Sequence, residues 1–354
     1  MNPLDDLQSI GKLDTLCMRV YLQGWPEQLR QGWRDIAGFP LPEGYGGVSR
    51  VVILGMGGSA IGGDLVRRLV AGESRVPVVV HRDYDLPAFV DANSLVIASS
   101  YSGNTEEVLT ALSQAARLGA RRIAISSGGK LAEVAAQEGI PYFRFGYQAP
   151  PRAGLGYGFA TLLGLLCRLG LVKDRSAEIA ETVKVLEKVC WELNENVPAD
   201  RNLAKKLAGK LHGRLIVVYG AGLLSEVAFR WKTQFNENSK AWAFCEQLPE
   251  LNHNAVLGYE FPKEISRNAC VILLRSPLLH PRHLLRQLVT AELLGRAGVV
   301  YDIVEGEGQS PLSQMMTSTV IGDYVSYYLS LLNKTDPGPV PSIDYLKKRL
   351  EEER

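Results

Sequence analysis

Residues 95–107 read LVIASSYSGNTEE and decide the fold, because a short apolar run leads through a polar turn into a helix. An apolar run of this length is typical of a strand that is covered on both faces, and residues 106–118 continue with a helical pattern. The same alternation recurs around it, with further strands expected at 51–54, 76–80 and 122–126. It predicts a parallel sheet in a doubly wound α/β domain.

The second half of the chain repeats this architecture without repeating the motif. Strands are expected at 215–219, 269–274 and 299–303, after a helical stretch that is broken by polar residues and a proline at 194–200. We therefore predict an α/β protein with two doubly wound parallel-sheet subdomains and helical ends. Its expected parts are a helical N-terminal leader (1–45), a first domain (46–155), a helical connector (156–212), a second domain (213–335), and a C-terminal segment with a helix (336–354).

Composition narrows the class of partner. The 354 residues are 46% hydrophobic and 22% charged, and 39 basic residues balance 38 acidic ones to a net charge of +1. Such a chain has no long-range field for nucleic acid or a membrane surface, so a small molecule is the expected partner. The five scattered cysteines show no metal-like spacing, and neither a signal peptide nor a membrane span is evident. We expect a cytoplasmic protein without a metal.

A first glycine-rich turn, GMGGSAIGGD at 55–64, lies between an expected strand and an expected helix. Backbone N–H groups at such a helix start favour an anion. The spacing also matches a dinucleotide-binding fingerprint, for which Asp83 or Asp85 would be the ribose-binding acid. A third interpretation is that the glycines serve only the geometry of a tight turn.

The second turn, at residues 100–105, favours a phosphate. It brings three hydroxyl groups and a glycine to the start of a helix, and Asn104 with Glu107 resembles a capping box. Hydroxyl and backbone donors at this density suit a dianion, whereas capping needs only one such residue. We predict a phosphate cradle from Ser100, Ser102 and Thr105. The first turn would contact the sugar or complete the cradle through Gly57, Gly58 and Ser59.

Five motifs together resemble one family. Their residues are 55–64, 100–106, 151–157 (PRAGLGY), 236–238 (NEN) and 249–254 (PELNHN). In this order they resemble the bifunctional phosphoglucose/phosphomannose isomerases of the sugar isomerase (SIS) superfamily, over nearly the whole chain. The resemblance implies a cofactor-free homodimer that interconverts glucose 6-phosphate, and mannose 6-phosphate, with fructose 6-phosphate.

Aldose–ketose isomerisation needs two acid–base groups. Glu237 is the candidate that removes the carbon-bound proton, and the resemblance points to the same residue; the residues alone allow equally an ion pair with Lys240. His253 lies in a polar loop, where an imidazole can move protons near neutral pH. The resemblance implies that His253 opens the sugar ring and reaches the site from the neighbouring subunit.

The reaction also needs a cation beside the developing oxyanion. Arg152 is the candidate, on the strength of its Pro-Arg-Ala context. The resemblance implies a further lysine near the C-terminus, for which we choose Lys347 over Lys348. The segment 336–340 departs from the family pattern, because Gly338 stands where many relatives carry a hydroxyl residue.

Three alternatives compete with the isomerase. The isomerase half of a glucosamine 6-phosphate-forming amidotransferase would need a glutaminase domain with an N-terminal cysteine, whereas this sequence starts Met1-Asn2-Pro3. A non-catalytic sugar-phosphate sensor would carry a basic helix-turn-helix, which is not evident. An NAD-dependent dehydrogenase would leave residues 100–105 without a role.

Overall fold

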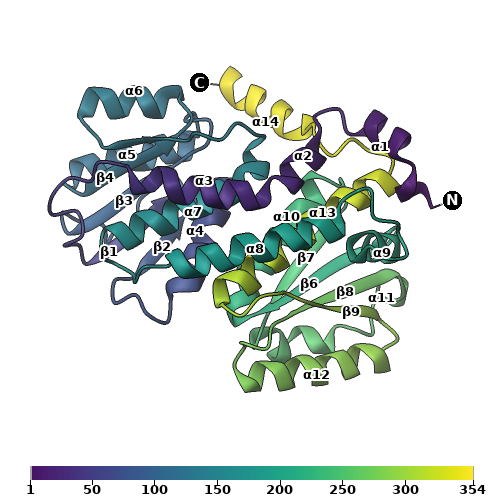
Figure 1. Ribbon diagram of the computed structural model, residues 1–354. Helices are drawn as coiled ribbons and strands as arrows, with labels where there is room; N and C mark the ends of the chain where they lie inside the picture. Colours follow the sequence, from purple (N-terminus) through teal and green to yellow (C-terminus); the bar gives the residue numbers. More distant parts are fainter. Residues whose placement is uncertain (1, 354) are drawn as a thin grey trace. The chain divides into compact units, whose positions relative to one another are not determined.

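Two parallel sheets organise the chain (Figure 1). The first sheet has five strands in the order β2-β1-β3-β4-β5, and the second has four in the order β7-β6-β8-β9. The computed structural model describes residues 2–353, so Met1 and Arg354, the ends of the predicted leader and C-terminal segment, lie outside the described residues. The predicted α/β fold with two parallel sheets and helical ends is confirmed.

The contacts within the chain define two compact units. Unit 1 comprises residues 1–23, 188–307 and 314–354, and unit 2 comprises residues 24–187 and 308–313. The five-stranded sheet lies in unit 2 and the four-stranded sheet in unit 1. Among the described residues, no helix has both the length and the apolar character that a membrane span requires.

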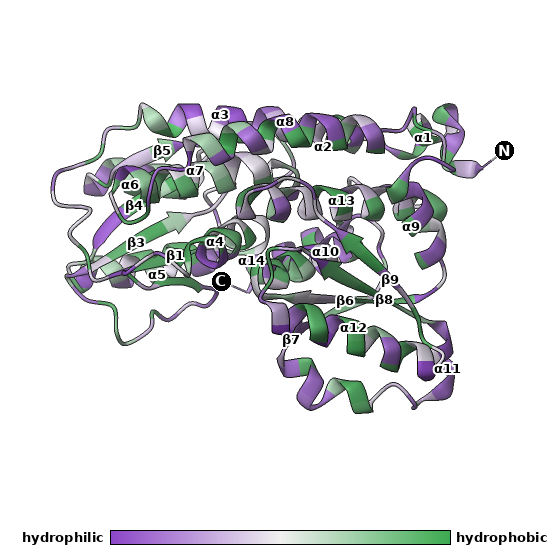
Figure 2. Cartoon of the chain, turned by 60° about the horizontal axis from the view of Figure 1, so that its bottom comes forward, coloured by the Kyte–Doolittle hydropathy of each residue, from purple (hydrophilic) through white to green (hydrophobic). Residues whose placement is uncertain are grey.

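The sheet of unit 2 has a fully buried centre. Its strands are β1 (Arg50–Leu54), β2 (Val78–His81), β3 (Ser94–Ser99), β4 (Arg121–Ser126) and β5 (Tyr142–Arg144). All six residues of β3 are buried, and Figure 2 shows β1 and β3 as largely hydrophobic. The predicted central strands agree within one residue, whereas β2 begins two residues later than expected. Strand β5 is a three-residue edge strand that we did not predict.

Helices enclose this sheet. They are α3 (Trp25–Ala37), α4 (Gly57–Val70), α5 (Glu106–Arg117), α6 (Gly129–Glu138), α7 (Leu155–Arg168) and the first part of α8 (Ser176–Leu193). Helix α5 ends one residue before the predicted boundary. Helices α3 and α7 pack closely, because Gly32 lets them approach: a Cβ at this position would lie 2.5 Å from the Tyr157 carbonyl oxygen.

Unit 1 holds the second sheet. Its strands are β6 (Leu215–Ala221), β7 (Ala243–Leu248), β8 (Ala269–Arg275) and β9 (Val300–Glu305). Its helices include α1 (Leu7–Leu13), α2 (Met18–Gln23), α9 (Leu203–Leu211), α10 (Ser225–Glu237), α11 (Lys263–Asn268), α12 (Pro281–Arg296), most of α13 (Pro311–Leu332), and α14 (Pro341–Glu352). We did not predict β7, an edge strand whose side chains are partly exposed and partly polar.

A buried ion pair joins α10 to α13. The Arg230 guanidinium donates to both carboxylate oxygens of Asp323, at 3.0 and 2.9 Å, and both side chains are almost fully buried. The next residue of α10, Trp231, donates its indole N–H to the Ser318 carbonyl oxygen of α13 at 2.8 Å. This ring lies where a Cβ of Gly322 would stand, so the two helices pack at close range.

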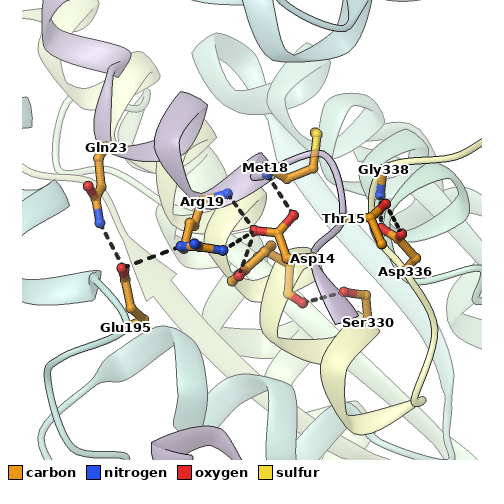
Figure 3. Close-up of polar contacts among 10 residues, drawn as sticks. Asp14, Thr15, Met18, Arg19, Gln23, Glu195, Ser330, Asp336 and Gly338 are labelled. Carbon is orange, nitrogen blue, oxygen red and sulfur yellow. Dashed lines mark hydrogen bonds and ion pairs between the residues drawn. The ribbon is translucent and has the colours of Figure 1, made fainter. Parts of the chain in front are cut away.

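The start of the N-terminal leader is fixed to α13 by the buried side chain of Asp14 (Figure 3). Its carboxylate accepts hydrogen bonds from Met18 N at 2.6 Å, from the Arg19 guanidinium at 3.1 Å and from the Tyr327 hydroxyl at 3.1 Å. Burial raises the pKa of Tyr327, so its hydroxyl stays a neutral donor. This part of the leader therefore belongs to unit 1.

We expect Asp323→Asn to lower the free energy of unfolding by about 3–5 kcal/mol, because it leaves the Arg230 charge buried without its carboxylate. Replacing both residues together, Arg230→Met with Asp323→Leu, should cost less than Asp323→Asn alone. The matched control is Lys348→Met, which removes an exposed pair with Glu352 at 3.9 Å and should cost no more than about 0.5 kcal/mol. Urea unfolding measures all three, and equal losses for Asp323→Asn and the control would contradict this role of the buried pair.

Candidate active site

The strand order of unit 2 places two predicted turns side by side. Strand β1 lies between β2 and β3, and Leu54 at its carboxyl end pairs with Ala98 of β3. Chain order reverses at this pair, and ligands of open parallel sheets bind at the carboxyl ends of strands at such a reversal. The turns that follow β1 and β3 are 55–59 and 100–105, the two that the sequence singled out.

The two turns contact each other directly. The backbone N–H of Tyr101 donates to the Ser59 hydroxyl at 3.2 Å. Gly55 permits this approach, since a Cβ there would lie 3.2 Å from the Ser99 carbonyl oxygen. A side chain at position 55 would therefore crowd the end of β3 and the start of α4.

The second turn gathers hydroxyl groups. The hydroxyls of Ser100 and Thr105 lie 2.7 Å apart, and the Ser100 hydroxyl also accepts from Gly103 N at 3.2 Å. Ser100 is 2% exposed, whereas Ser102 is exposed. Gly103 has a φ of +71°, and a Cβ there would lie 1.8 Å from the Gly128 carbonyl oxygen. Only glycine fits at this position.

The predicted capping box is wrong. Helix α5 begins at Glu106 with Thr105 as its N-cap residue, and the Thr105 side chain makes no capping hydrogen bond. Asn104 instead accepts from Lys130 N at 3.0 Å through its amide oxygen. The hydroxyls are therefore not used as caps, and the start of α5 presents backbone N–H groups of the kind that bind anions.

A glycine pair after β4 supports the cradle, and sequence reasoning missed it. The Gly128–Lys130 turn lies against the second turn: Gly129 has a φ of +70°, and a Cβ there would lie 2.4 Å from the Ser102 carbonyl oxygen. Leu131 N also donates to the Gly103 carbonyl oxygen at 2.9 Å. The signal was available, because two adjacent glycines closely follow the predicted strand 122–126.

A third segment, the 3₁₀ turn Pro151–Gly154, lies beside the two turns of unit 2. The 3₁₀ turn Pro151–Gly154 lies against the start of α4, where a Cβ of Gly58 would stand 3.0 Å from the Pro151 carbonyl oxygen. The Tyr101 hydroxyl accepts from Ala149 N at 2.9 Å, so the second turn is also tied to this segment. Arg152, 4% exposed, is thereby placed among the same three segments. A small pocket between them is lined by residues that include Gly58, Ser59, Ser99, Tyr101, Phe145 and Pro151.

The remainder of the 151–157 motif has a structural explanation. Gly156 donates its N–H to the Gln28 side chain at 3.2 Å and lies against the Trp25 ring, which a Cβ would meet at 2.8 Å. The Tyr157 hydroxyl donates to Asp35 at 3.0 Å and accepts from Gly146 N at 3.1 Å. Burial raises the pKa of Tyr157 to about 12, so it remains a neutral donor.

In unit 1, Glu237 is the last residue of α10 and is half-buried. The asparagines on either side hold the backbone around it: Asn236 donates to the Ala241 carbonyl oxygen at 2.9 Å, and Asn238 donates to the Ser326 hydroxyl at 2.9 Å. The Lys240 ammonium contacts the main-chain carbonyl oxygen of Glu237 at 2.8 Å.

His253 ends the 3₁₀ turn Glu250–His253, and its side chain is exposed. Its neighbours fix the loop, because Asn252 donates to the Thr290 hydroxyl and Asn254 donates to the Glu250 carboxylate, both at 2.9 Å. Beside it lies a hollow lined by Asn252, Val256, Arg282, Leu285, Arg286, Val289 and Leu293.

The two C-terminal lysines lie on α14, where both side chains are exposed. Lys348 pairs with Glu352 of the same helix at 3.9 Å.

The structure does not favour a dinucleotide-binding site in unit 2. The order β2-β1-β3-β4-β5 differs from the 3-2-1-4-5-6 order of dinucleotide-binding sheets. Asp83 accepts from Tyr84 N at 2.8 Å within its own turn, and Asp85 accepts from the Gln114 side chain of α5 at 3.2 Å, so both carboxylates have hydrogen-bond partners within unit 2. Among residues 2–353, no group of three or more His, Cys, Asp or Glu side chains is arranged to hold a metal ion.

Comparisons with known proteins agree with this arrangement. Residues 47–136 match the SIS domain family, and residues 200–350 match the bacterial phospho-glucose isomerase C-terminal SIS domain. A bifunctional phosphoglucose/phosphomannose isomerase of Caldicellulosiruptor bescii is 42% identical over 92% of this chain and 97% of its own length. The enzyme of that name from Aquifex aeolicus is 36% identical over 90% and 94%.

Among solved structures, a hypothetical protein from Thermus thermophilus has the same fold, with a TM-score of 0.74 at 18% identity over 99% of this chain and 93% of its own. The relatives confirm the resemblance seen in the five motifs. This chain belongs to the bifunctional phosphoglucose/phosphomannose isomerase family.

Proposed function

We propose that this chain interconverts glucose 6-phosphate, and mannose 6-phosphate, with fructose 6-phosphate by aldose–ketose isomerisation. The observation that carries the proposal is the hydroxyl cluster of Ser100 and Thr105 at the start of α5, in a member of this family. Family membership alone would leave the phosphate site unassigned, and the cluster alone would fit any sugar-phosphate binder.

The 6-phosphate binds to the second turn. Ser100, Ser102 and Thr105 donate their hydroxyl hydrogens to phosphate oxygens, and backbone N–H groups at the start of α5 supply further donors. These donors are neutral, so they hold a dianion without an opposing charge. The first turn contacts the sugar through Gly57, Gly58 and Ser59.

The chemistry moves one proton between two carbons. His253 assists ring opening by protonating the ring oxygen. The Glu237 carboxylate removes the proton from C2 of the open-chain aldose, which gives a cis-enediolate, and the resulting carboxylic acid returns a proton to C1. The proton on the C2 hydroxyl moves to the C1 oxygen, so that C2 is oxidised and C1 is reduced. Arg152 stabilises the charge on the enediolate oxygens, and Lys347 assists.

The active form is a homodimer in which His253 serves the partner's site. What supports this is the exposure of His253 together with large apolar side chains on the elements around it: Leu257 is 84% exposed, Phe261 69% and Leu288 56%. A second copy of the chain would cover these side chains and receive the imidazole.

The proposal also covers the domain organisation of the chain and its compartment in the cell. Residues 46–155 and 213–335 are the two SIS domains, joined by 156–212 and flanked by the leader 1–45 and the segment 336–354. The enzyme needs neither cofactor nor metal and works in the cytoplasm. The five cysteines, all free thiols in the structure, suit a reducing compartment.

A coupled assay tests the function. Purified protein should convert fructose 6-phosphate into glucose 6-phosphate and mannose 6-phosphate at the same rate with and without EDTA, because the proposed steps use only side chains. If neither glucose 6-phosphate nor mannose 6-phosphate is formed, the isomerase proposal is overturned. If EDTA abolishes the conversion, the proposed independence from metal is overturned.

Ser100→Ala should raise KM for fructose 6-phosphate about tenfold or more with kcat nearly unchanged, because a hydrogen bond to a charged group contributes about 1.5–3 kcal/mol to ground state and transition state alike. The backbone bond from Gly103 N to the Ser100 carbonyl oxygen, at 3.0 Å, keeps the turn in place. Ser113→Ala is the matched control, since that exposed hydroxyl on α5 bonds only its own helix. An unchanged KM in Ser100→Ala would contradict the cradle.

Mixing two inactive variants tests the exchange of His253. Glu237→Gln and His253→Asn should each lose a factor of about 100 or more in kcat while still binding fructose 6-phosphate. After the two are unfolded and refolded together, about a quarter of the wild-type activity should return, because half of the dimers are mixed and one of their two sites is complete. If His253 serves its own subunit, mixing restores nothing.

A further inference from the structure

We propose that Lys240 is a positioning residue for Glu237, because it fixes the end of α10 to the segment Asp336–Val340. The inference rests on the proposed function, in which Glu237 is the base. It adds a residue outside the five motifs to the machinery of the reaction, and this residue acts through Glu237 without touching the substrate.

The contacts of the Lys240 ammonium carry the inference. It donates to the carbonyl oxygen of Glu237 at 2.8 Å and to the carbonyl oxygen of Asp336, 96 residues further along the chain, at 2.7 Å. A lysine that merely caps a helix contacts the last carbonyls of its own helix. This one also holds a distant segment, so it works as a cross-link.

The backbone at the junction adopts a conformation that side chains disfavour. Among residues 2–353, Cys17, Lys240 and Lys334 are the non-glycine residues with positive φ, at 51°, 51° and 54°. Cys17 follows Thr15 by two residues, and Lys334 precedes Asp336 by two. Each such residue costs about 1–2 kcal/mol and persists only where its surroundings determine it, often at functional sites. Lys240 combines this left-handed backbone with an ammonium that contacts both carbonyl oxygens.

Besides its contact with Lys240, Asp336 is bonded to the leader; Figure 3 shows this second contact, between Asp336 and Thr15. The Thr15 hydroxyl donates to its carboxylate, and Gly338 N donates to the same carboxylate at 2.8 Å. Leu16 of the leader lies against Gly338, where a Cβ would come within 2.8 Å of its side chain. This explains the departure from the family pattern, since the leader occupies the space that a side chain at position 338 would take.

The structure therefore joins three distant parts of the sequence at the end of the base-bearing helix. The asparagines at 236 and 238 fix the backbone of Glu237 locally, and Lys240 fixes it to the segment 336–340. A base that is displaced by about 1 Å can lose a factor of up to about 100 in rate. Loss of the ammonium should thus slow catalysis without weakening the binding of phosphate, which lies with unit 2.

The test compares Lys240→Met, Lys240→Gly and Lys232→Met. Lys240→Met should lower kcat about ten- to a hundredfold and leave KM within about twofold and Tm within about 2 °C. Lys240→Gly accepts the left-handed backbone but lacks the ammonium, and it should be equally slow. Lys232→Met is the control on the same helix; its ammonium lies over the Phe229 ring, and its loss should leave kcat unchanged. Lys240→Arg, which keeps the charge and the donors, should recover part of the rate.

Hydrogen exchange separates this proposal from the proposed function. Peptides that cover residues 236–241 and 334–340 should exchange faster in Lys240→Met than in wild type or Lys232→Met, whether or not the enzyme turns over any sugar phosphate. Unchanged exchange in both peptides would overturn the cross-link. A wild-type kcat in Lys240→Met, or a loss confined to KM, would overturn its role in positioning Glu237. An inactive wild-type protein with the faster exchange would overturn the function alone.

Discussion

The pairing of β1 with β3 is the constraint on which the proposed phosphate cradle depends. Because these parallel strands are neighbours at the point where chain order reverses, the turns that follow them emerge side by side, and the bond from Tyr101 N to the Ser59 hydroxyl joins them. Gly103 then allows a backbone approach that no Cβ would permit, and at Gly55 and Gly58 a Cβ would make unusually tight contacts. The proposed cradle is thus a consequence of sheet topology, and Thr105, the N-cap residue of α5, makes no side-chain capping bond.

Sequence patterns predicted the buried strands and the turns between them, because burial on both faces demands continuous apolar runs. They missed two of the edge strands, β5, which has only three residues, and β7, which mixes exposed and polar side chains, although the edge strands β2 and β9 were predicted. They also failed at Asn104, whose amide satisfies a backbone group of the turn after β4 in place of its own helix. That choice depends on a contact between residues 26 positions apart, which no local pattern records.

The surroundings of Glu237 were equally out of reach of the sequence. The NEN motif singled out Glu237 as a candidate, but the partners of Asn238 and of Lys240 lie on α13 and in the segment 336–340. The bond between Thr15 and Asp336 joins residues 321 positions apart. Such contacts form only after the chain has folded, so the sequence alone did not show that the leader, predicted as a helical segment, contributes to the surroundings of Glu237.

The central claim is that this chain moves a proton between C2 and C1 through an enediolate, and isotope exchange tests it most directly. Fructose 6-phosphate is converted in ²H₂O, and the glucose 6-phosphate formed is examined by proton NMR. We expect deuterium at C2 of the product, because a carboxylic acid formed from the base exchanges its proton with solvent before returning it. Product wholly without deuterium would mean a direct hydrogen shift and would contradict the role of a carboxylate base.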